Sequence, residues 1–282
     1  MSFFIGLLPA LFWGINPVLV SKCGGKPINQ QLGTAFACGI LAVVTYVIIR
    51  PAMTTAIFIG CLISGLAWSI GQLCQYTSYV VLGTSRAFAI SISIEMFLNS
   101  MVASLIFREW QTPRQLILGF AAIACVILGG NFTAYESEKG SVDMKKGLII
   151  LTVGALGFCV WNYAIRFVGA EGFDAVCPQA IGMVVGSLIL SCFVGKDVKK
   201  FDKSTFKQTL AGLCYACANF ALIFSNKLNG VGVGYTMAQL CLVFEFIFGI
   251  VILKEKRTKK ELTHSIWGAA FITVGCIMIG LI

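Results

Sequence analysis

The chain has 282 residues, of which 58% are hydrophobic and only 12% are charged, and its mean hydropathy is +0.89. Soluble domains carry about 25% charged residues, so this composition excludes an ordinary soluble protein. The net charge of +9 does not indicate nucleic-acid binding, because the basic residues stand in short segments between apolar runs, as they do in the loops of membrane proteins.

Ten apolar segments follow one another along the chain, separated by Gly, Pro and charged residues. A helix needs about 20 residues to cross the bilayer core, so each segment is predicted to be a transmembrane helix. The first segment lacks the basic residues that begin a signal peptide, and we expect it to be a span. The predicted fold is an all-α polytopic membrane protein, with spans at 3–21, 30–49, 54–81, 85–107, 112–131, 145–167, 174–194, 205–226, 233–253 and 264–282.

The basic residues indicate the orientation of these spans. The segments that follow odd-numbered spans hold 16 of the 21 Lys and Arg residues, and the segments on the other side hold 5. Positive residues prefer the cytoplasmic side of a membrane. Both termini of this multi-pass membrane protein are therefore predicted to be external.

The two halves of the chain resemble each other. When Gly65–Gln72 is laid on Gly212–Asn219, Trp68 falls on Tyr215 and Gln72 on Asn219, and the same offset of 147 carries Gly83 onto Gly230. Because each half has an odd number of spans, the halves would insert in opposite senses. The sequence predicts one transmembrane domain, 1–282, built from two inverted five-helix repeats at 1–135 and 144–282, with the site at their interface, as in secondary transporters.

A polar and aromatic stripe runs along the third span. Trp68, Gln72, Gln75, Tyr76 and Tyr79 are spaced so that they share one helical face. Aromatic rings can stack on a sugar while amides bond its hydroxyl groups, which favours a sugar-binding cavity. The alternative is packing between helices, since Gln and Tyr often bond across membrane helices.

Two carboxyl groups are predicted to lie inside spans. Glu95 shares a face of span 4 with Ser91 and Asn99, and a carboxyl group removed from water there could exchange a proton during transport; the alternative is a structural acid. Glu245 has small residues on its face of span 9, which favours a hydrogen bond between helices over a role in transport. Both are proton-coupling candidates.

Other polar residues inside the spans complete the predicted substrate site. Span 1 has a proline, Pro17, that would kink it beside a cavity, and Gln239 points away from the face of Glu245. The further substrate-binding candidates are Trp13, Asn16, Trp161, Asn162, Gln179, Asn219 and Gln239.

Motifs for enzymatic chemistry are missing from the sequence. It has no GxSxG, HExxH or P-loop motif and only one histidine, His264. The 12 cysteines are scattered through apolar runs, which is typical of core residues and not of a disulfide framework or metal site. We therefore expect no catalytic residue, no cofactor and no metal, and a protein that is not an enzyme.

Several segments resemble the bacterial glucose/ribose uptake proteins, a family of sugar transporters within the drug/metabolite transporter superfamily. The resemblance implies ten spans, a plasma-membrane location and sugar uptake, with proton symport as the expected mechanism. It runs nearly end to end and is carried by Trp13–Pro17, Gly24–Gln30, Trp68–Gln72, Gly83–Ala87, Pro178–Met183, Lys227–Gly230, Ala238–Gln239 and Glu255–Thr258.

Three departures from the family pattern fall in spans 4 and 9. Ala89 stands where a proline is expected, Glu95 replaces a glutamine, and Glu245 replaces an apolar residue. We expect an importer of a monosaccharide, with protons and the lipid bilayer as its other partners. The alternatives are an exporter or exchanger of another small polar metabolite in the same superfamily, and a non-transporting scaffold or sensor subunit. The sequence predicts no particular sugar and no oligomeric state.

Overall fold

The computed structural model describes residues 2–108, 110–133, 135, 143–170, 172–229, 237–254 and 258–281. All regular structure in these ranges is helical, as predicted. The helices are α1 (Ser2–Cys23), α2 (Pro27–Ile49), α3 (Thr55–Leu82), α4 (Thr84–Leu105), α5 (Pro113–Thr133), α6 (Met144–Phe167), α7 (Phe173–Phe193), α8 (Lys203–Asn229), α10 (Cys241–Ile252) and α11 (Lys259–Gly280).

Eight of these helices, α1 to α8, are long and apolar enough to cross a membrane. They match the first eight predicted spans to within a few residues. The predicted ninth span, 233–253, lies partly outside the described residues, and α10 is a shorter apolar helix of 12 residues. Helix α11 begins at Lys259, five residues before the predicted tenth span. The prediction starts later because it follows apolar residues, and the first turn of α11 is basic. The protein is a polytopic integral membrane protein.

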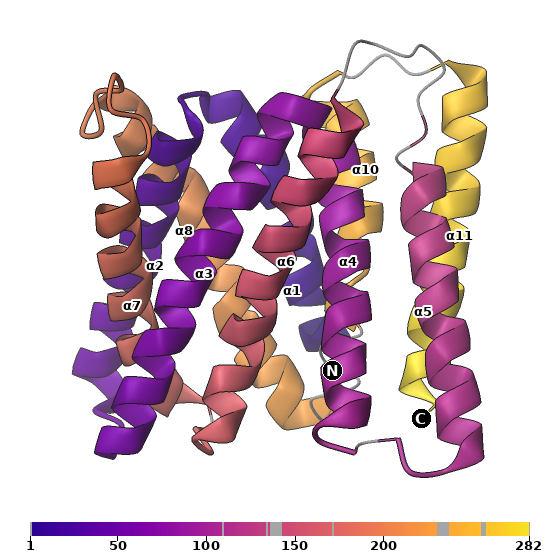
Figure 1. Cartoon of the computed structure of the whole chain (residues 1–282), viewed down its shortest axis with the longest axis horizontal. Coiled ribbons are helices and arrows are strands. Elements are labelled where there is room, and N and C mark those ends of the chain that lie inside the picture. Colours follow the sequence, from indigo (N-terminus) through magenta and orange to yellow (C-terminus); the bar gives the residue numbers. More distant parts are fainter. Residues whose placement is uncertain are drawn as a thin grey trace.

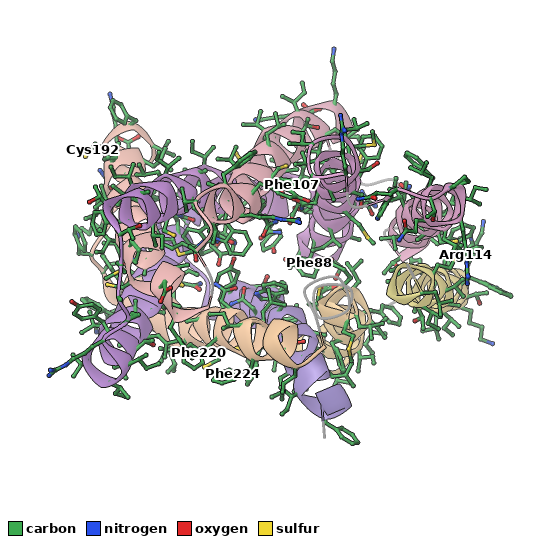
Figure 2. All side chains as sticks on the ribbon, turned by 90° about the horizontal axis from the view of Figure 1, so that it is seen from below. Phe88, Phe107, Arg114, Cys192, Phe220 and Phe224 are labelled. Atoms are coloured by element: carbon green, nitrogen blue, oxygen red, sulfur yellow. The ribbon has the colours of Figure 1, made fainter. Side chains whose placement is uncertain are left out.

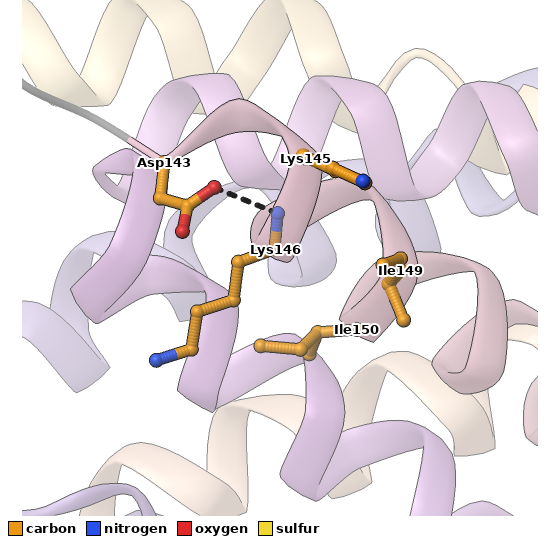
Figure 3. Close-up of a pocket in the computed structure, with 5 residues that line it drawn as sticks. All are labelled: Asp143, Lys145, Lys146, Ile149 and Ile150. Atoms are coloured by element: carbon orange, nitrogen blue, oxygen red, sulfur yellow. Dashed lines mark hydrogen bonds between the residues drawn. The ribbon is translucent and has the colours of Figure 1, made fainter.

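Local sequence signals set several helix ends. Pro27 occupies the first turn of α2, where its missing N–H costs no hydrogen bond. The Thr54 hydroxyl oxygen accepts from the backbone N–H of Ile57 at the start of α3, and the Asp143 carboxylate accepts from that of Lys146 at the start of α6 (Figure 3). Gly83, at φ 85°, separates α3 from α4 in a backbone conformation that glycine favours.

The helices form one bundle with an attached pair (Figure 1). Helix α1 packs along α8, and α3 packs along α6 and α7. Helix α2 lies against α7 and α8, α4 lies against α6, and α10 lies against α1. Helices α5 and α11 pack on each other at one side and meet the bundle mainly through α4.

Small residues allow the closest helix contacts. Gly65 of α3 and Gly182 of α7 leave no room for a side chain, since a Cβ on either would overlap backbone atoms of the other helix. Gly186, one turn beyond Gly182, lies against Ser69 in the same way. The face of α7 that carries Gly182 and Gly186, a GxxxG motif, is therefore the surface that packs on α3.

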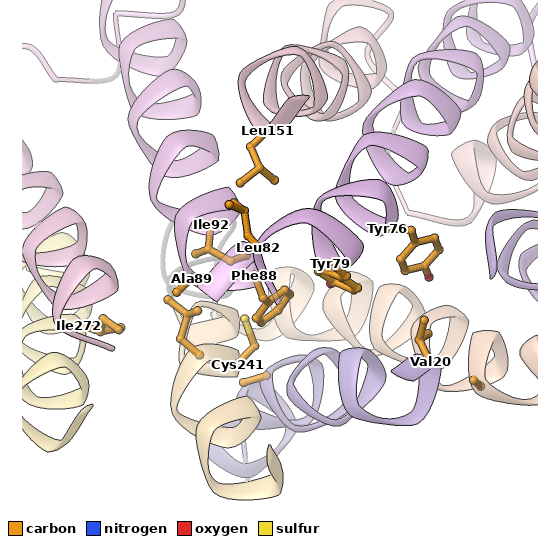
Figure 4. Close-up of a cluster of buried hydrophobic side chains, with 14 residues drawn as sticks. Val20, Tyr76, Tyr79, Leu82, Phe88, Ala89, Ile92, Leu151, Cys241 and Ile272 are labelled. Atoms are coloured by element: carbon orange, nitrogen blue, oxygen red, sulfur yellow. The ribbon is translucent and has the colours of Figure 1, made fainter. Parts of the chain in front are cut away.

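A buried apolar cluster joins α1, α3, α4 and α10 (Figure 4). Tyr79 and Leu82 of α3 lie in it with Phe88 of α4, Val20 of α1 and Cys241 of α10. The outer surface is apolar as well, as expected where helices face lipid; Figure 2 shows Phe220 and Phe224 at the periphery of α8.

Both chain ends lie toward the same end of the bundle (Figure 1). The connections α1–α2, α3–α4 and α7–α8 lie at the opposite end, and the first and last of these carry basic residues. The connections therefore alternate between the two ends of the bundle, and the orientation of the termini relative to the membrane stays a prediction.

Candidate functional site

An aromatic group lies where α1, α3, α6 and α8 meet. It consists of Trp13, Trp68, Trp161 and Tyr215. The indole N–H of Trp68 donates to the Tyr215 hydroxyl oxygen at 2.7 Å, and their ring centroids are 5.6 Å apart. Trp13 lies on the other side, with its ring centroid 6.4 Å from that of Tyr215. Trp68, Trp161 and Tyr215 are buried, and Trp13 is half-buried against them.

A chain of hydrogen bonds begins one turn along α3 from this group. The side-chain amide of Gln72 donates to Gln75 Oε1 at 3.0 Å, and the amide of Gln75 donates to Ser91 Oγ at 3.2 Å. The Ser91 hydroxyl then donates to Glu95 Oε1 at 2.6 Å. We call these four residues the amide chain. It connects the stripe of α3 to the carboxyl group of α4.

Asn99 connects the same face of α4 to α6. Asn162 Nδ2 donates to Asn99 Oδ1 at 3.3 Å, and the Tyr163 hydroxyl donates to the Asn99 carbonyl oxygen at 2.6 Å. Helices α1, α3, α4, α6 and α8 therefore all contribute polar or aromatic side chains to one central region.

Five buried polar atoms in this region have no hydrogen-bond partner within the described part of the chain. Leaving such a group unpaired costs about 1–3 kcal/mol, which favours a ligand that forms hydrogen bonds with these atoms. Three are donors and two are acceptors: Trp13 Nε1, Trp161 Nε1 and Asn99 Nδ2, and Gln72 Oε1 and Asn219 Oδ1. Other unpaired atoms lie outside the region, on Gln30, Gln31, Gln208 and Ser225. A mixture of donors and acceptors suits hydroxyl groups, which can both donate and accept.

Three predicted site residues instead bond neighbouring helices. Tyr76 pairs with the Thr34 hydroxyl of α2 at 2.8 Å. Asn16 donates to the Ala211 carbonyl oxygen of α8 at 3.2 Å, and Gln179 donates to the Ser64 hydroxyl of α3 at 2.9 Å. In this conformation these side chains join neighbouring helices, which for Tyr76 is the alternative interpretation of the stripe.

The two carboxyl groups have different surroundings. Glu95 is half-buried and ends the amide chain. Glu245 of α10 is fully buried and accepts from the Ser85 hydroxyl of α4 at 2.8 Å, which is the interhelical hydrogen bond that the sequence favoured. Gln239 is buried just before α10.

Tyr215 is the site residue that the sequence analysis missed, although its pairing with Trp68 was noted. The sequence offset could have identified Tyr215, since Trp68 and Tyr215 are separated by the repeat offset of 147. Equivalent residues of two halves related by a twofold axis touch each other only near that axis.

Two surface hollows are separate from the central region. One, of about 370 Å³, is lined by Asp143, Lys145, Lys146, Ile149 and Ile150 (Figure 3). The other, of about 650 Å³, is an apolar groove between α2 and α7. Neither is lined by a residue of the candidate site.

A bundle of membrane-spanning helices around a polar and aromatic centre is an architecture that membrane transport proteins use. The model of the sugar transport protein family matches residues 4–282, and the chain belongs to this family. Membership confirms the prediction of a transporter and not an enzyme.

Relatives match over their whole length. A putative sugar uptake protein of Listeria monocytogenes is 38% identical over 284 residues, covering 100% of this chain and 99% of the relative. The glucose uptake protein GlcU of Bacillus subtilis is 35% identical over 286 residues, covering 100% and 98%. A crystal structure with 12% identity matches with a TM-score of 0.70 over 99% of this chain and 97% of the other, a similarity of fold alone.

Proposed function

We propose that this protein imports a monosaccharide of the glucose or ribose type by proton symport, with the central region as the sugar site. The observation that carries the proposal is the set of five unpaired buried atoms around the aromatic group. The names of the relatives, which include glucose uptake proteins, support sugar as the substrate class.

The chemistry of the region suits a neutral sugar. Its three free donors and two free acceptors could each meet a hydroxyl group, and Trp13 and Trp161 offer ring faces for the apolar side of a pyranose or furanose. The proposed substrate-binding residues are Trp13, Asn16, Trp68, Gln72, Gln75, Tyr76, Trp161, Asn162, Gln179, Asn219 and Gln239, with Tyr215 and Asn99 added.

Alternating access between two inverted halves, 1–135 and 144–282, is supported by the packing. Helix α1 packs on α8 as α6 packs on α3, and α2 packs on α8 as α7 packs on α3. These are equivalent pairs when α1, α2 and α3 correspond to α6, α7 and α8. The hydrogen bond between Trp68 and Tyr215 would then lie on the axis that relates the halves, where transporter substrates bind.

Glu95 is the stronger candidate for proton coupling. It is connected to the sugar-facing amides through Ser91, whereas Glu245 bonds Ser85 between α4 and α10. We place the protein in the bacterial cell membrane with both termini external, as the sidedness of its basic residues favours.

An exporter or exchanger of another small polar metabolite is the second candidate. It is favoured by Glu95 and Glu245, which replace the neutral residues expected in sugar transporters of this kind.

A transport assay with the purified protein in proteoliposomes distinguishes the sugar importer from the exporter or exchanger. We expect labelled glucose or ribose to accumulate when an inward proton gradient is imposed, and a protonophore to abolish the accumulation. Efflux or exchange of another polar metabolite, without proton-driven accumulation of either sugar, would contradict symport and favour the second candidate.

A further inference from the structure

The hydrogen bonds of the amide chain all run in one direction. Gln72 donates to Gln75, Gln75 donates to Ser91, and Ser91 donates to Glu95. The remaining atom at the far end, Gln72 Oε1, is buried and has no partner in the described residues. The chain therefore begins at an acceptor open to a ligand and ends at a carboxyl group.

Ionised Glu95 fixes this direction. A carboxylate only accepts hydrogen bonds, so Ser91 must give its single O–H to Glu95, and its oxygen is left to accept from Gln75. Gln75 Oε1 then accepts from Gln72, whose own oxygen stays free. With Glu95 ionised, Gln72 presents an acceptor to a sugar hydroxyl group.

Protonation of Glu95 allows the opposite direction. The carboxylic acid can donate to Ser91 Oγ, which frees the serine hydroxyl hydrogen to point at Gln75. If both amides turn over, Gln75 accepts from Ser91 and donates to Gln72, and Gln72 presents its N–H to the ligand. The only covalent change is the O–H bond formed on Glu95 by a proton from water.

We propose that Ser91 is a positioning residue that transmits the protonation state of Glu95 to Gln72, and so couples the proton to the sugar. This inference rests on the proposed function. Ser91 is suited to the role because it is the hydroxyl group between the carboxyl group and the amides, and a hydroxyl group can reverse its direction by rotation alone. It is also buried, so water does not replace it in the chain.

Other groups near Glu95 are placed differently. Tyr79 of α3 lies in the buried apolar cluster, and Tyr215 of α8 accepts from Trp68. Tyr163 of α6 donates to the Asn99 carbonyl oxygen. Arg86 lies more than two turns away along α4, and Glu245 of α10 bonds Ser85. Among the described hydrogen bonds, only that of Ser91 reaches the Glu95 carboxyl group.

The test compares Ser91→Ala with the parent protein in proteoliposomes. Counterflow of labelled sugar should persist, with apparent affinity reduced about two- to tenfold for the loss of one hydrogen bond. Proton-driven accumulation should be lost, and the apparent affinity in counterflow should no longer change with pH as it does in the parent. Ser91→Thr, which restores a hydroxyl group, should recover accumulation.

Ser93→Ala is the matched control, because the Ser93 hydroxyl bonds only the Ala89 carbonyl oxygen of its own helix among the described contacts. It should accumulate sugar as the parent does. If Ser91→Ala accumulates sugar and responds to pH as the parent does, the role of Ser91 is overturned but the proposed function is not. If the parent protein transports no sugar, the proposed function and this inference are both overturned. If Ser91→Ala loses counterflow and Ser91→Thr does not recover it, the serine is structural and this inference alone is overturned.

Discussion

Gln72 is the residue at which the sugar and the protein are proposed to meet. Its amide donates to Gln75 and its oxygen is buried without a partner. Gln72→Leu removes both hydrogen bonds, each worth about 0.5–1.5 kcal/mol, so sugar affinity measured by counterflow should fall roughly tenfold. Expression and membrane insertion should be unchanged.

The control for Gln72→Leu is Thr77→Val on the same helix, since the Thr77 hydroxyl bonds the Leu73 carbonyl oxygen of its own helix. That variant should keep the parent's affinity. If Gln72→Leu also binds sugar as tightly as the parent, the stripe on α3 serves helix packing.

Glu95 is expected to carry the coupling proton. Glu95→Gln keeps an acceptor for the Ser91 hydroxyl but cannot ionise, and its amide can also donate to Ser91. A proton can therefore no longer set the direction of the amide chain. This variant should exchange labelled sugar across the membrane but should not accumulate it when a proton gradient is supplied.

Glu245→Gln provides the comparison, because its side-chain oxygen can still accept from Ser85 and we expect it to accumulate sugar. Undiminished accumulation by Glu95→Gln would make that carboxyl group structural. If Glu245→Gln lost accumulation instead, the coupling role would pass to α10.

The sequence predicted candidate residues better than their partners. Helical spacing identified the stripe on α3 and the face of Ser91, Glu95 and Asn99, because residues four apart on a helix share a face. It did not predict that Gln75 bonds Ser91 or that Asn162 bonds Asn99, since those contacts depend on how α3, α4 and α6 cross. For the same reason, the sequence could not show whether Tyr76 and Gln179 bind substrate or bond a neighbouring helix.

At the scale of helices, the contact between α3 and α7 depends on two glycines. A Cβ on Gly65 would overlap the Gln179 carbonyl oxygen and lie 2.8 Å from Gly182 Cα. Gly65→Ala should therefore separate the helices at a cost of roughly 1–3 kcal/mol, measurable as a lower Tm in detergent.

Gly39→Ala is the control for this packing, because the nearest atom to its Cβ would be a methyl carbon of Val184 at 3.2 Å, which can shift. Its Tm should stay close to that of the parent. Equal Tm values for Gly65→Ala and the parent would contradict the close packing of α3 on α7.

Most helices could be predicted from apolar length, since the bilayer sets a minimum of about 20 residues per span. At the C-terminal end the structure tests the prediction only in part. Apolar length indicated one span over 233–253, of which 233–236 lie outside the described residues, and the 12-residue α10 forms its C-terminal part. The basic first turn of α11 extends that helix beyond its apolar residues, which a hydropathy pattern does not detect.

For the whole molecule, the orientation is open to a direct test. The termini lie at the end of the bundle away from the basic α1–α2 and α7–α8 connections, and positive residues prefer the cytoplasm. A tag at the C-terminus should therefore be accessible to antibody in intact cells whose outer layers have been made permeable to it. A tag protected until the cell membrane is lysed would reverse the orientation without changing the fold.

The proposed inverted repeat would account for both the sequence offset of 147 and the helix pairs. A pattern in one sequence can indicate that two halves are equivalent, but it does not give their relative placement. The contact between Trp68 and Tyr215 supplies that link and locates the proposed axis at the aromatic group, where the unpaired donors and acceptors gather.

Counterflow in proteoliposomes tests sugar transport most directly, because it requires substrate binding and alternating access but no proton coupling. Vesicles loaded with unlabelled glucose or ribose should take up the labelled sugar transiently, and excess unlabelled sugar outside should compete with it. Vesicles loaded with an unrelated polar metabolite should not. Absence of counterflow with a panel of monosaccharides, by protein that is folded and correctly inserted, would contradict the assignment of the central region as a sugar site.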